Sequence, residues 1–240
     1  MKNIVEVRNF KMAFGGKVVI SDLSFEVKEG EIFGLLGANG SGKTTTLRAL
    51  LGFYVPSGGE LLIDGKKYDP EDMSVTVGYL PEERGLYRKE SVIDTMTYFG
   101  ELKGLKNPRE WSLKYLERVK LSDKADEKLE KLSGGQQQKV QLGVTIMNEP
   151  KLLILDEPTK GFDPMNRRLL MEIIDELHQK GTAVIMITHY MDEVEKLCDR
   201  ALLLKDGKAR AYGAIKDIKK EFGGKSLDQI FVDIYGEENE

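Results

Sequence analysis

The chain has 240 residues, of which 40% are hydrophobic and 32% charged, and its formal net charge is −4. This length suits one large α/β domain with an insert, and the lack of a basic block argues against nucleic acid as the main partner. No apolar run approaches the roughly 20 residues that a membrane-spanning helix needs. The single cysteine, Cys198, allows no internal disulfide, so we expect a reducing, cytoplasmic compartment.

The first thirty residues predict short antiparallel strands. Apolar and polar residues alternate over residues 4–7, 18–20 and 23–27, with glycine turns at 15–16 and 29–30. The chain therefore enters a strand at its start, rather than a signal peptide.

A glycine-rich segment, residues 37–44, follows the apolar run 32–36 and precedes a helix expected over 45–51. It fits the pattern G-x-x-x-x-G-K-[ST], whose glycines let backbone N–H groups face a phosphate at a helix start. Lys43 can reach the β- and γ-phosphates, and Thr44 can offer its hydroxyl to Mg²⁺. The alternative is an ordinary glycine-rich turn. The predicted nucleotide-binding residues are Gly37, Asn39, Gly40, Ser41, Gly42, Lys43, Thr44 and Thr45.

The middle of the chain changes from strands to helices. A turn at 56–59 leads to a strand over 60–63, a hairpin turn follows at 64–65, and another strand is expected over 75–80. From 86 to 149 the pattern is helical: Ser91 can cap one helix, Pro108 can open a second, and a third follows Ser133. We therefore predict a strand-rich core (1–85 and 150–215) and a helical arm (86–149).

A second candidate site lies at residues 152–157, where four apolar residues precede Asp156 and Glu157. This pattern predicts a buried parallel strand, and ligands of open α/β sheets bind at the carboxyl ends of such strands. Asp156 would then lie near Thr44 and hold Mg²⁺, while Glu157 would orient and deprotonate an attacking water. The alternative is a strand that ends in solvated acids.

Residues 132–136 read Leu-Ser-Gly-Gly-Gln and start the third helix. Ser133 is a good N-cap, and Gly134 and Gly135 expose backbone N–H groups, so this helix start, with Gln136, predicts a second anion site. The alternative is a capped surface helix. The segment resembles the signature sequence of ATP-binding cassette (ABC) ATPases, and the resemblance continues through nearly the whole chain.

This resemblance implies a P-loop NTPase (RecA-like) α/β core with an antiparallel β subdomain and a helical insert, which binds ATP and Mg²⁺. Residues 1–235 would form a single ABC ATPase domain, followed by an acidic tail at 236–240. Phe14 stands where these proteins carry an aromatic that stacks on adenine; the alternative is packing against the first sheet. His189, after the apolar run 183–187, matches the switch histidine, which would contact the γ-phosphate and hold Glu157.

Two positions depart from the family pattern. Glu82 stands in the Q-loop, where glutamine is usual, and its carboxylate could bind Mg²⁺ more strongly or repel the phosphates. Lys160 precedes Gly-Phe-Asp-Pro (161–164), which resembles the D-loop, at a position more often held by a small residue. It either adds a cation near a dimer seam or points to water.

The C-terminal segment, about 214–235, is expected to be helical. Ser226 can cap a last helix with Leu227, Ile230, Phe231 and Ile234 on one face. This apolar face either packs on the protein's own core or joins a contact with a partner.

The resemblance also implies how the protein would work. Two copies would form a head-to-tail homodimer around two ATP molecules, with the signature of one facing the γ-phosphate held by the other. A separate integral membrane subunit would be driven, with Leu86 and Tyr87 as anchors unless they belong to a solvated loop. Residues 78–87 resemble the exporter-type subgroup of sodium- and drug-efflux ATPases, which implies a peripheral position at the cytoplasmic face of the membrane. Two alternatives remain: a soluble ABC ATPase for iron–sulfur assembly or nucleic acid, and a regulatory module without turnover.

Overall fold

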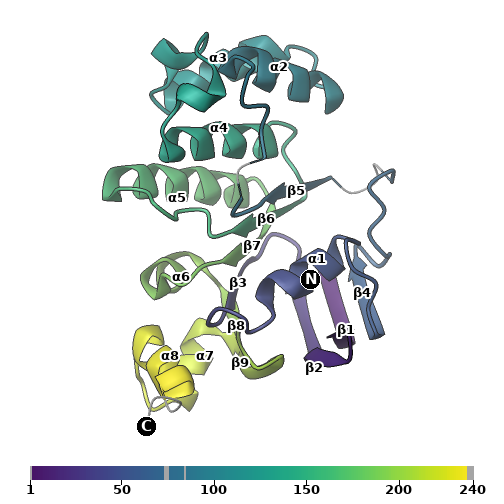
Figure 1. Cartoon of the computed structure of the whole chain (residues 1–240). Coiled ribbons are helices and arrows are strands. Elements are labelled where there is room, and N and C mark those ends of the chain that lie inside the picture. Colours follow the sequence, from purple (N-terminus) through teal and green to yellow (C-terminus); the bar gives the residue numbers. More distant parts are fainter. Residues whose placement is uncertain (1, 73–75, 84, 237–240) are drawn as a thin grey trace.

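The computed structural model describes residues 2–72, 76–83 and 85–236. It contains a six-stranded sheet in the order β5-β6-β7-β3-β8-β9 and a three-stranded antiparallel sheet in the order β2-β1-β4 (Figure 1). The six-stranded sheet consists of β5 (Val77–Leu80), β6 (Leu152–Asp156), β7 (Ala183–Ile187), β3 (Ile32–Leu36), β8 (Arg200–Lys205) and β9 (Lys208–Ala214). The other sheet consists of β1 (Asn3–Phe14), β2 (Lys17–Lys28) and β4 (Gly58–Ile63).

The strands β5, β6, β7, β3 and β8 are parallel, and β9 returns antiparallel to β8 through a turn at Asp206 and Gly207. Every residue of β3, β6 and β7 is buried. Strands covered on both faces need apolar residues on both sides, which explains the continuous apolar runs in the sequence. Because these strands are parallel, the loops that follow β3, β5, β6 and β7 all leave the same edge of the sheet.

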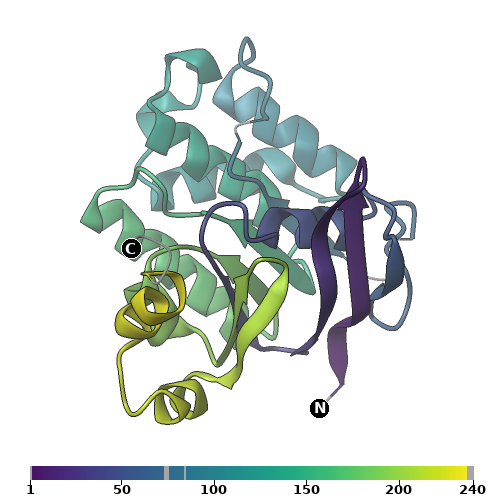
Figure 2. The same cartoon turned by 60° about the horizontal axis from the view of Figure 1, so that its bottom comes forward.

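The helices form separate groups around this sheet (Figure 1). Helices α2, α3 and α4 lie together at one end of the molecule, α5 lies between them and the sheet, and α7 and α8 lie beside β9. In Figure 2 the long β1–β2 hairpin stands on the side of the sheet that carries α1. The helices are α1 (Lys43–Leu50), α2 (Val92–Leu102), α3 (Pro108–Arg118), α4 (Gly134–Ile146), α5 (Pro164–Gln179), α6 (Met191–Leu197), α7 (Ile215–Glu221) and α8 (Leu227–Tyr235).

Alternate residues of the central strands belong to two different apolar cores. In β3, Ile32 and Leu36 pack into a core shared with the helical arm, α5 and the C-terminal helices. Phe33 and Leu35 pack into a second core, shared with α1 and the three-stranded sheet. This division follows from the two-residue side-chain period of a strand.

Residues 3–28 form two long strands, so the prediction of several short ones was wrong. The β1–β2 pairing shifts register at several points, including between Val7 and Phe10. Asn9, at this irregularity, has a φ of 47°, and its N–H donates to Ser24 Oγ at 2.9 Å. Such bulges interrupt the apolar alternation without ending the strand, and the sequence pattern alone does not distinguish the two cases.

One turn prediction and one strand prediction differ from the structure in detail. The turn at Asp64 and Gly65 forms, but it closes a single bridge between Ile63 and Lys66 rather than a pair of strands. The strand expected from residue 75 is described from Val77 onward, and residue 75 itself lies outside the described residues.

The last helix packs on the protein's own core. Ser226 and Gln229 form a capping box at its start, and Leu227 and Ile230 are buried in the core that also contains the arm. Of the predicted acidic tail, residues 237–240 lie outside the described residues. Cys198 is buried directly after α6, where it packs in the core. Among the described residues, no helix combines the length and apolar character that crossing a membrane requires.

Candidate nucleotide-binding site

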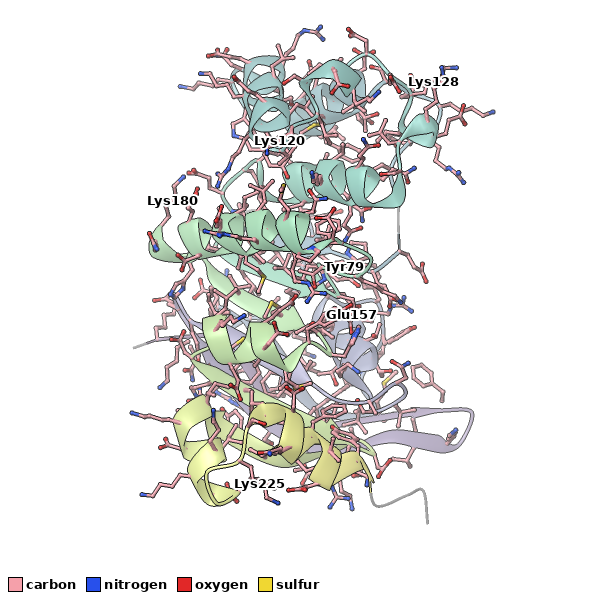
Figure 3. All side chains as sticks on the ribbon, turned by 90° about the vertical axis from the view of Figure 1, so that its left-hand side faces the viewer. Tyr79, Lys120, Lys128, Glu157, Lys180 and Lys225 are labelled. Atoms are coloured by element: carbon pink, nitrogen blue, oxygen red, sulfur yellow. The ribbon has the colours of Figure 1, made fainter. Side chains whose placement is uncertain are left out.

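Residues that are far apart in the sequence meet at the carboxyl edge of the parallel sheet. The glycine-rich loop follows β3, Asp156 ends β6, and His189 lies two residues beyond β7. Strands β6 and β7 are direct neighbours, and the Glu157 N–H donates to the carbonyl of Ile187 at 2.9 Å. Figure 3 labels Glu157 at this edge. The structure thus brings the two predicted acidic residues and the predicted histidine together.

The loop between β3 and α1 is shaped so that two of its glycines accept no side chain. A Cβ on Gly37 would lie 2.5 Å from the carbonyl oxygen of Leu204 and 2.5 Å from Ser41 Oγ. A Cβ on Gly42 would lie 2.4 Å from Ile20 Cδ1, and Gly42 also has a φ of 108°. Close packing beneath the loop therefore fixes these glycines, while Asn39 and Gly40 at its tip are exposed.

Lys43 folds back over its own loop. Its side chain is buried, and Nζ donates to the carbonyl oxygens of Gly37 at 2.7 Å and Ala38 at 3.0 Å. Burial lowers the pKa of Lys43, and the nearby carboxylates Glu157 and Asp156 oppose that shift. A buried ammonium whose hydrogen bonds go to two neutral carbonyls is well placed to exchange them for an anion.

The loop also contains a polar atom suited to a ligand. Ser41 Oγ is buried and has no hydrogen-bond partner within the described part of the chain. Leaving a buried hydroxyl unsatisfied costs about 1–3 kcal/mol, so an acceptor or donor bound in this loop would relieve that cost. Thr44 and Thr45, at the first turn of α1, are half-buried. These observations fit a bound phosphate group.

The acidic residues at the end of β6 lie in a crowded negative region. Burial, with smaller contributions from the charges of Glu82 and Glu157, raises the pKa of Asp156 to about 6, while the charge of Lys43 opposes the shift. Bringing a cation to this edge would stabilise the charged form of Asp156.

Glu157 lies directly after β6 with a backbone φ of 50°, in the left-handed region. For a residue other than glycine this conformation costs roughly 1–2 kcal/mol. Its hydrogen bond to Ile187 holds it there, and strain of this kind concentrates at functional sites. His189 Nδ1 lies 2.8 Å from Glu157 Oε2, an ion-pair distance when the ring is protonated.

Phe14 lies at the tip of the β1–β2 hairpin with 43% of its surface exposed. Its ring meets the Tyr54 ring edge-on, with the centroids 5.1 Å apart. The side chain is therefore not buried against the first sheet, and a ring surface remains open to a planar ligand. The neighbouring Tyr54 was not predicted from the sequence.

The signature segment forms a separate feature. Ser133 Oγ accepts the N–H of Gln136 at 3.4 Å, and Gln136 Oε1 accepts the N–H of Ser133 at 2.8 Å, so the predicted N-cap is confirmed as a capping box. Together with Gly134 and Gly135, these residues line a cavity of about 470 Å³ beside residues 160–163. Helix α4 lies in a different layer of the molecule from α1 (Figure 1), so the two predicted anion sites lie on different parts of the chain.

Glu193, in α6, is a buried residue that the sequence does not predict as part of this region. This carboxylate is 2% exposed and accepts hydrogen bonds from Thr159 Oγ1 at 3.1 Å and Thr188 Oγ1 at 3.4 Å. Arg167 Nε lies 3.3 Å from it. Glu193 thereby connects the end of β6 to the end of β7. An acidic first turn is typical of an exposed helix start, and nothing in the sequence indicates that this residue is buried.

The two departures from the family pattern contact each other. Lys160 Nζ donates to Glu82 Oε1, which joins the loop after β5 to the loop after β6.

Comparison with known proteins identifies the family of the chain. A family model described as ABC transporter matches residues 20–160. An uncharacterized ABC transporter ATP-binding protein of Methanocaldococcus jannaschii is 48% identical over 91% of this chain and 80% of its own length. The linearmycin resistance ATP-binding protein of Bacillus subtilis is 34% identical over 95% of this chain and 75% of its own. A Nod factor export ATP-binding protein of Cupriavidus metallidurans is 36% identical over 100% of this chain and 79% of its own length.

Two solved structures share the fold. One, the ATP-binding subunit of an ABC transporter, superposes with a TM-score of 0.88 at 30% identity and covers 96% of this chain and 98% of its own. A nucleotide-free ATP-binding cassette from an ABC transporter superposes with a TM-score of 0.79 at 23% identity. The match covers 94% of this chain and 97% of that structure's chain. The predicted fold class is confirmed. The chain belongs to the family of ABC transporter ATP-binding proteins, the subunits that bind and hydrolyse ATP.

Proposed function

We propose that two copies of this chain close around two ATP molecules with Mg²⁺ and that the closing and opening drive a separate membrane subunit of the exporter type. The observation that carries the proposal is the meeting of Lys43, Asp156, Glu157 and His189 at one edge of the parallel sheet. That combination offers a cation for phosphate, an acid for a metal and a base for water.

In the proposed site, the loop at 37–44 cradles the phosphates with its backbone N–H groups. Lys43 exchanges its bonds with Gly37 O and Ala38 O for phosphate oxygens. Phe14, exposed at the hairpin tip, offers its ring to the adenine base.

The proposed metal ligands are Thr44, Asp156 and Glu82. Among the described residues, no cluster of three or more His, Cys, Asp or Glu side chains is arranged to hold a metal ion. Mg²⁺ is usually held by one or two protein carboxylates and takes its remaining ligands from phosphates and water. The metal would offset the negative charge that develops on the phosphates.

For hydrolysis, we propose that Glu157 orients a water molecule toward the γ-phosphorus and accepts its proton. The new bond joins the water oxygen to that phosphorus, while the bond to the β-phosphate oxygen breaks. His189, 2.8 Å from Glu157, holds the carboxylate in position and donates to a γ-phosphate oxygen.

Within one chain the signature segment lies apart from the phosphate loop, which supports the proposal of a dimer. Ser133, Gly134 and Gly135 present a helix start that is exposed or half-buried, and a helix start favours an anion. In a twofold head-to-tail pair each signature faces the ATP of the other copy, so the nucleotide is a ligand of both. Loss of the γ-phosphate then removes much of the link between the copies.

Replacing Ser133 with arginine is expected to leave ATP binding to a single copy unchanged and to lower ATP turnover by at least about 100-fold, as expected when transition-state groups are displaced. The larger, charged arginine side chain would occupy the space that the ATP held by the other copy needs. Steady-state phosphate release and equilibrium binding measure the two effects.

Ser226→Arg is the matched control, because Ser226 forms the same capping box at the start of α8. Both variants lose a helix cap that contributes about 1 kcal/mol to stability. A difference in turnover between them therefore reports on the position of Ser133 and not on the loss of a cap. Equal turnover in the two variants would contradict a role of the signature across the dimer.

A cavity beside the Q-loop supports the proposed membrane partner. It has a volume of about 610 Å³, and residues of the Q-loop, α4 and the D-loop line it, including Leu86, Arg88 and Gln141. Tyr87, 54% exposed, stacks on Phe99 with ring centroids 5.9 Å apart, so it remains on the surface instead of folding into the core. We propose that a short helix of the membrane subunit occupies this cavity.

The names of two relatives, Nod factor export and linearmycin resistance, support an exporter and a position at the cytoplasmic face of the membrane. The test is fractionation of native cells together with an assay of purified protein. Co-purification with an integral membrane protein and ATP hydrolysis that requires Mg²⁺ are the expected results. Recovery only in the soluble fraction would favour a non-transport ABC ATPase, and binding without turnover would favour a regulatory module.

The C-terminal helix supports the phosphate loop from below. Tyr235 Oη donates to the carbonyl oxygen of Leu204 at 2.7 Å, and this same oxygen packs against Gly37. Burial raises the pKa of Tyr235, while the backbone N–H of Ala38 opposes the shift. Tyr235, the last residue of α8, therefore contacts Leu204, which packs against Gly37, and Ala38 of the loop itself.

We expect Tyr235→Phe to weaken ATP binding about threefold to tenfold, since a hydrogen bond of this kind contributes about 1 kcal/mol. Isothermal titration calorimetry measures the affinity. Tyr115→Phe is the control: its hydroxyl donates to Lys139 O at 2.8 Å in the helical arm. That variant should lose a similar free energy of unfolding but keep its ATP affinity, and an equal loss of affinity in both variants would refute the prediction.

A further inference from the structure

An ion pair joins the Q-loop to the D-loop beside the candidate site. Glu82 follows β5 and Lys160 follows β6, 78 positions apart in the sequence, and the ammonium donates to the carboxylate at 2.5 Å. The two side chains are 46% and 58% exposed. Because β5 and β6 are adjacent parallel strands, the pair joins the two loops at the edge that carries Asp156 and Glu157.

The carboxylate of Glu82 acts on the groups that the proposed site uses. Its charge contributes to the raised pKa of Asp156, and it opposes the lowering of the pKa of Lys43. Glu82 is therefore close enough to alter the charge balance where the phosphates are proposed to bind. An unpaired carboxylate at this position would repel a polyphosphate.

Lys160 is placed between two parts of the proposed machinery. It lines the cavity beside the Q-loop together with Glu82 and Glu157, and it also lines the cavity that contains Ser133 and Gly134. Lys160 forms an ion pair with Glu82, which is the main cause of its raised pKa, and the charge of Glu157 contributes less.

The pair is weak as a source of stability. An ion pair between exposed side chains contributes about 0–1 kcal/mol, because solvent screens the charges and two flexible side chains are immobilised. The partners can therefore separate and re-form readily. Its effect is expected on the charge of the site rather than on folding.

We propose that Lys160 is a positioning residue that acts through Glu82: by neutralising this carboxylate it allows ATP to bind beside three acidic residues before a metal ion is present. When a divalent cation is bound, Glu82 can turn to the metal and Lys160 is released toward the surface that carries the signature. This inference rests on the proposed ATP–Mg²⁺ site and adds a charge exchange between its two loops.

The test is a double-mutant cycle on ATP affinity, measured by calorimetry in EDTA and again in Mg²⁺. In EDTA, Lys160→Met should weaken ATP binding about fivefold, the upper range for an exposed pair. Adding Glu82→Gln to this variant should restore the affinity to within about twofold of Glu82→Gln alone. In Mg²⁺ the loss in Lys160→Met should shrink to less than about twofold, because the metal neutralises Glu82 instead.

A second exposed pair provides the matched control. Lys180 Nζ lies 2.9 Å from Glu149 Oε1, with side chains 63% and 69% exposed. Figure 3 shows Lys180 at the end of α5 that lies away from Glu157. Lys180→Met removes an equivalent surface charge and should leave the ATP affinity unchanged under both conditions.

Two results would overturn the inference. If Lys160→Met weakens ATP binding equally with and without Glu82→Gln, the lysine acts on the nucleotide directly. If the loss is the same in EDTA and in Mg²⁺, the proposed exchange does not occur. Failure of the wild-type chain to bind ATP under either condition would instead contradict the nucleotide site itself, and the inference with it.

Discussion

Lys43→Ala is expected to lower the affinity for ATP by at least about 100-fold, because two charge-assisted hydrogen bonds of about 1.5–3 kcal/mol each are lost. In the structure this ammonium lies over the loop and is held by Gly37 O and Ala38 O. The Lys43 ammonium is already desolvated by burial. Replacing its two neutral carbonyl partners with phosphate oxygens therefore gains more binding free energy than replacing water would. Equilibrium titration with ATP measures the loss.

The control is another lysine whose pKa is lowered by burial. Lys103 donates to Thr145 O at 3.4 Å and Asn148 Oδ1 at 3.3 Å in the helical arm. Lys103→Ala removes a desolvated ammonium of the same kind, so any general effect on folding appears in both variants. Circular dichroism confirms that both are folded. If Lys43→Ala retains the affinity of Lys103→Ala, residues 37–44 are not the phosphate site.

Glu157→Gln is expected to keep ATP affinity while lowering the hydrolysis rate by about 1000-fold, within the range for loss of a general base. The amide has nearly the same shape, but it accepts no proton from water and has no charge to pair with His189. ATP should then remain bound between two copies, because the step that separates them is blocked. Phosphate release measures the rate, and light scattering at saturating ATP measures the mass.

Glu149→Gln is the control for this variant. Glu149 also has a positive φ, 47°, and its exposed carboxylate pairs with Lys180 away from the site. The same chemical change there should affect neither the rate nor the mass. A Glu157→Gln protein that stays monomeric with ATP bound would contradict the proposed dimer, whereas unchanged turnover would contradict the role of Glu157.

The parts of the site that could be predicted are those encoded in short segments. The proposed phosphate loop is eight consecutive residues, and the strand predicted before it and the helix predicted after it are both present. Ser91, Ser133 and Ser226 were correctly predicted as N-caps, because capping depends on residues within one turn. The buried strands β6 and β7 were predicted from uninterrupted apolar runs.

Features that depend on contacts across the fold could not be predicted in this way. The pairing of Glu82 with Lys160 depends on β5 lying next to β6, and the contact of Tyr235 with Leu204 depends on how α8 docks. The burial of Glu193 depends on threonines from two other loops. None of these relations leaves a local pattern, since each contact joins residues that are far apart in the sequence or lie on different elements.

The division of β3 and β6 between two apolar cores has a mechanical consequence. Each of these strands ends in a loop of the candidate site, and each has successive side chains anchored in opposite halves of the molecule. A strand fixed in this way can neither slide nor tilt without disturbing close packing on both sides. A displacement of the Lys43 loop that moves β3 would therefore disturb packing on the side of the helical arm and on the side of the hairpin at once.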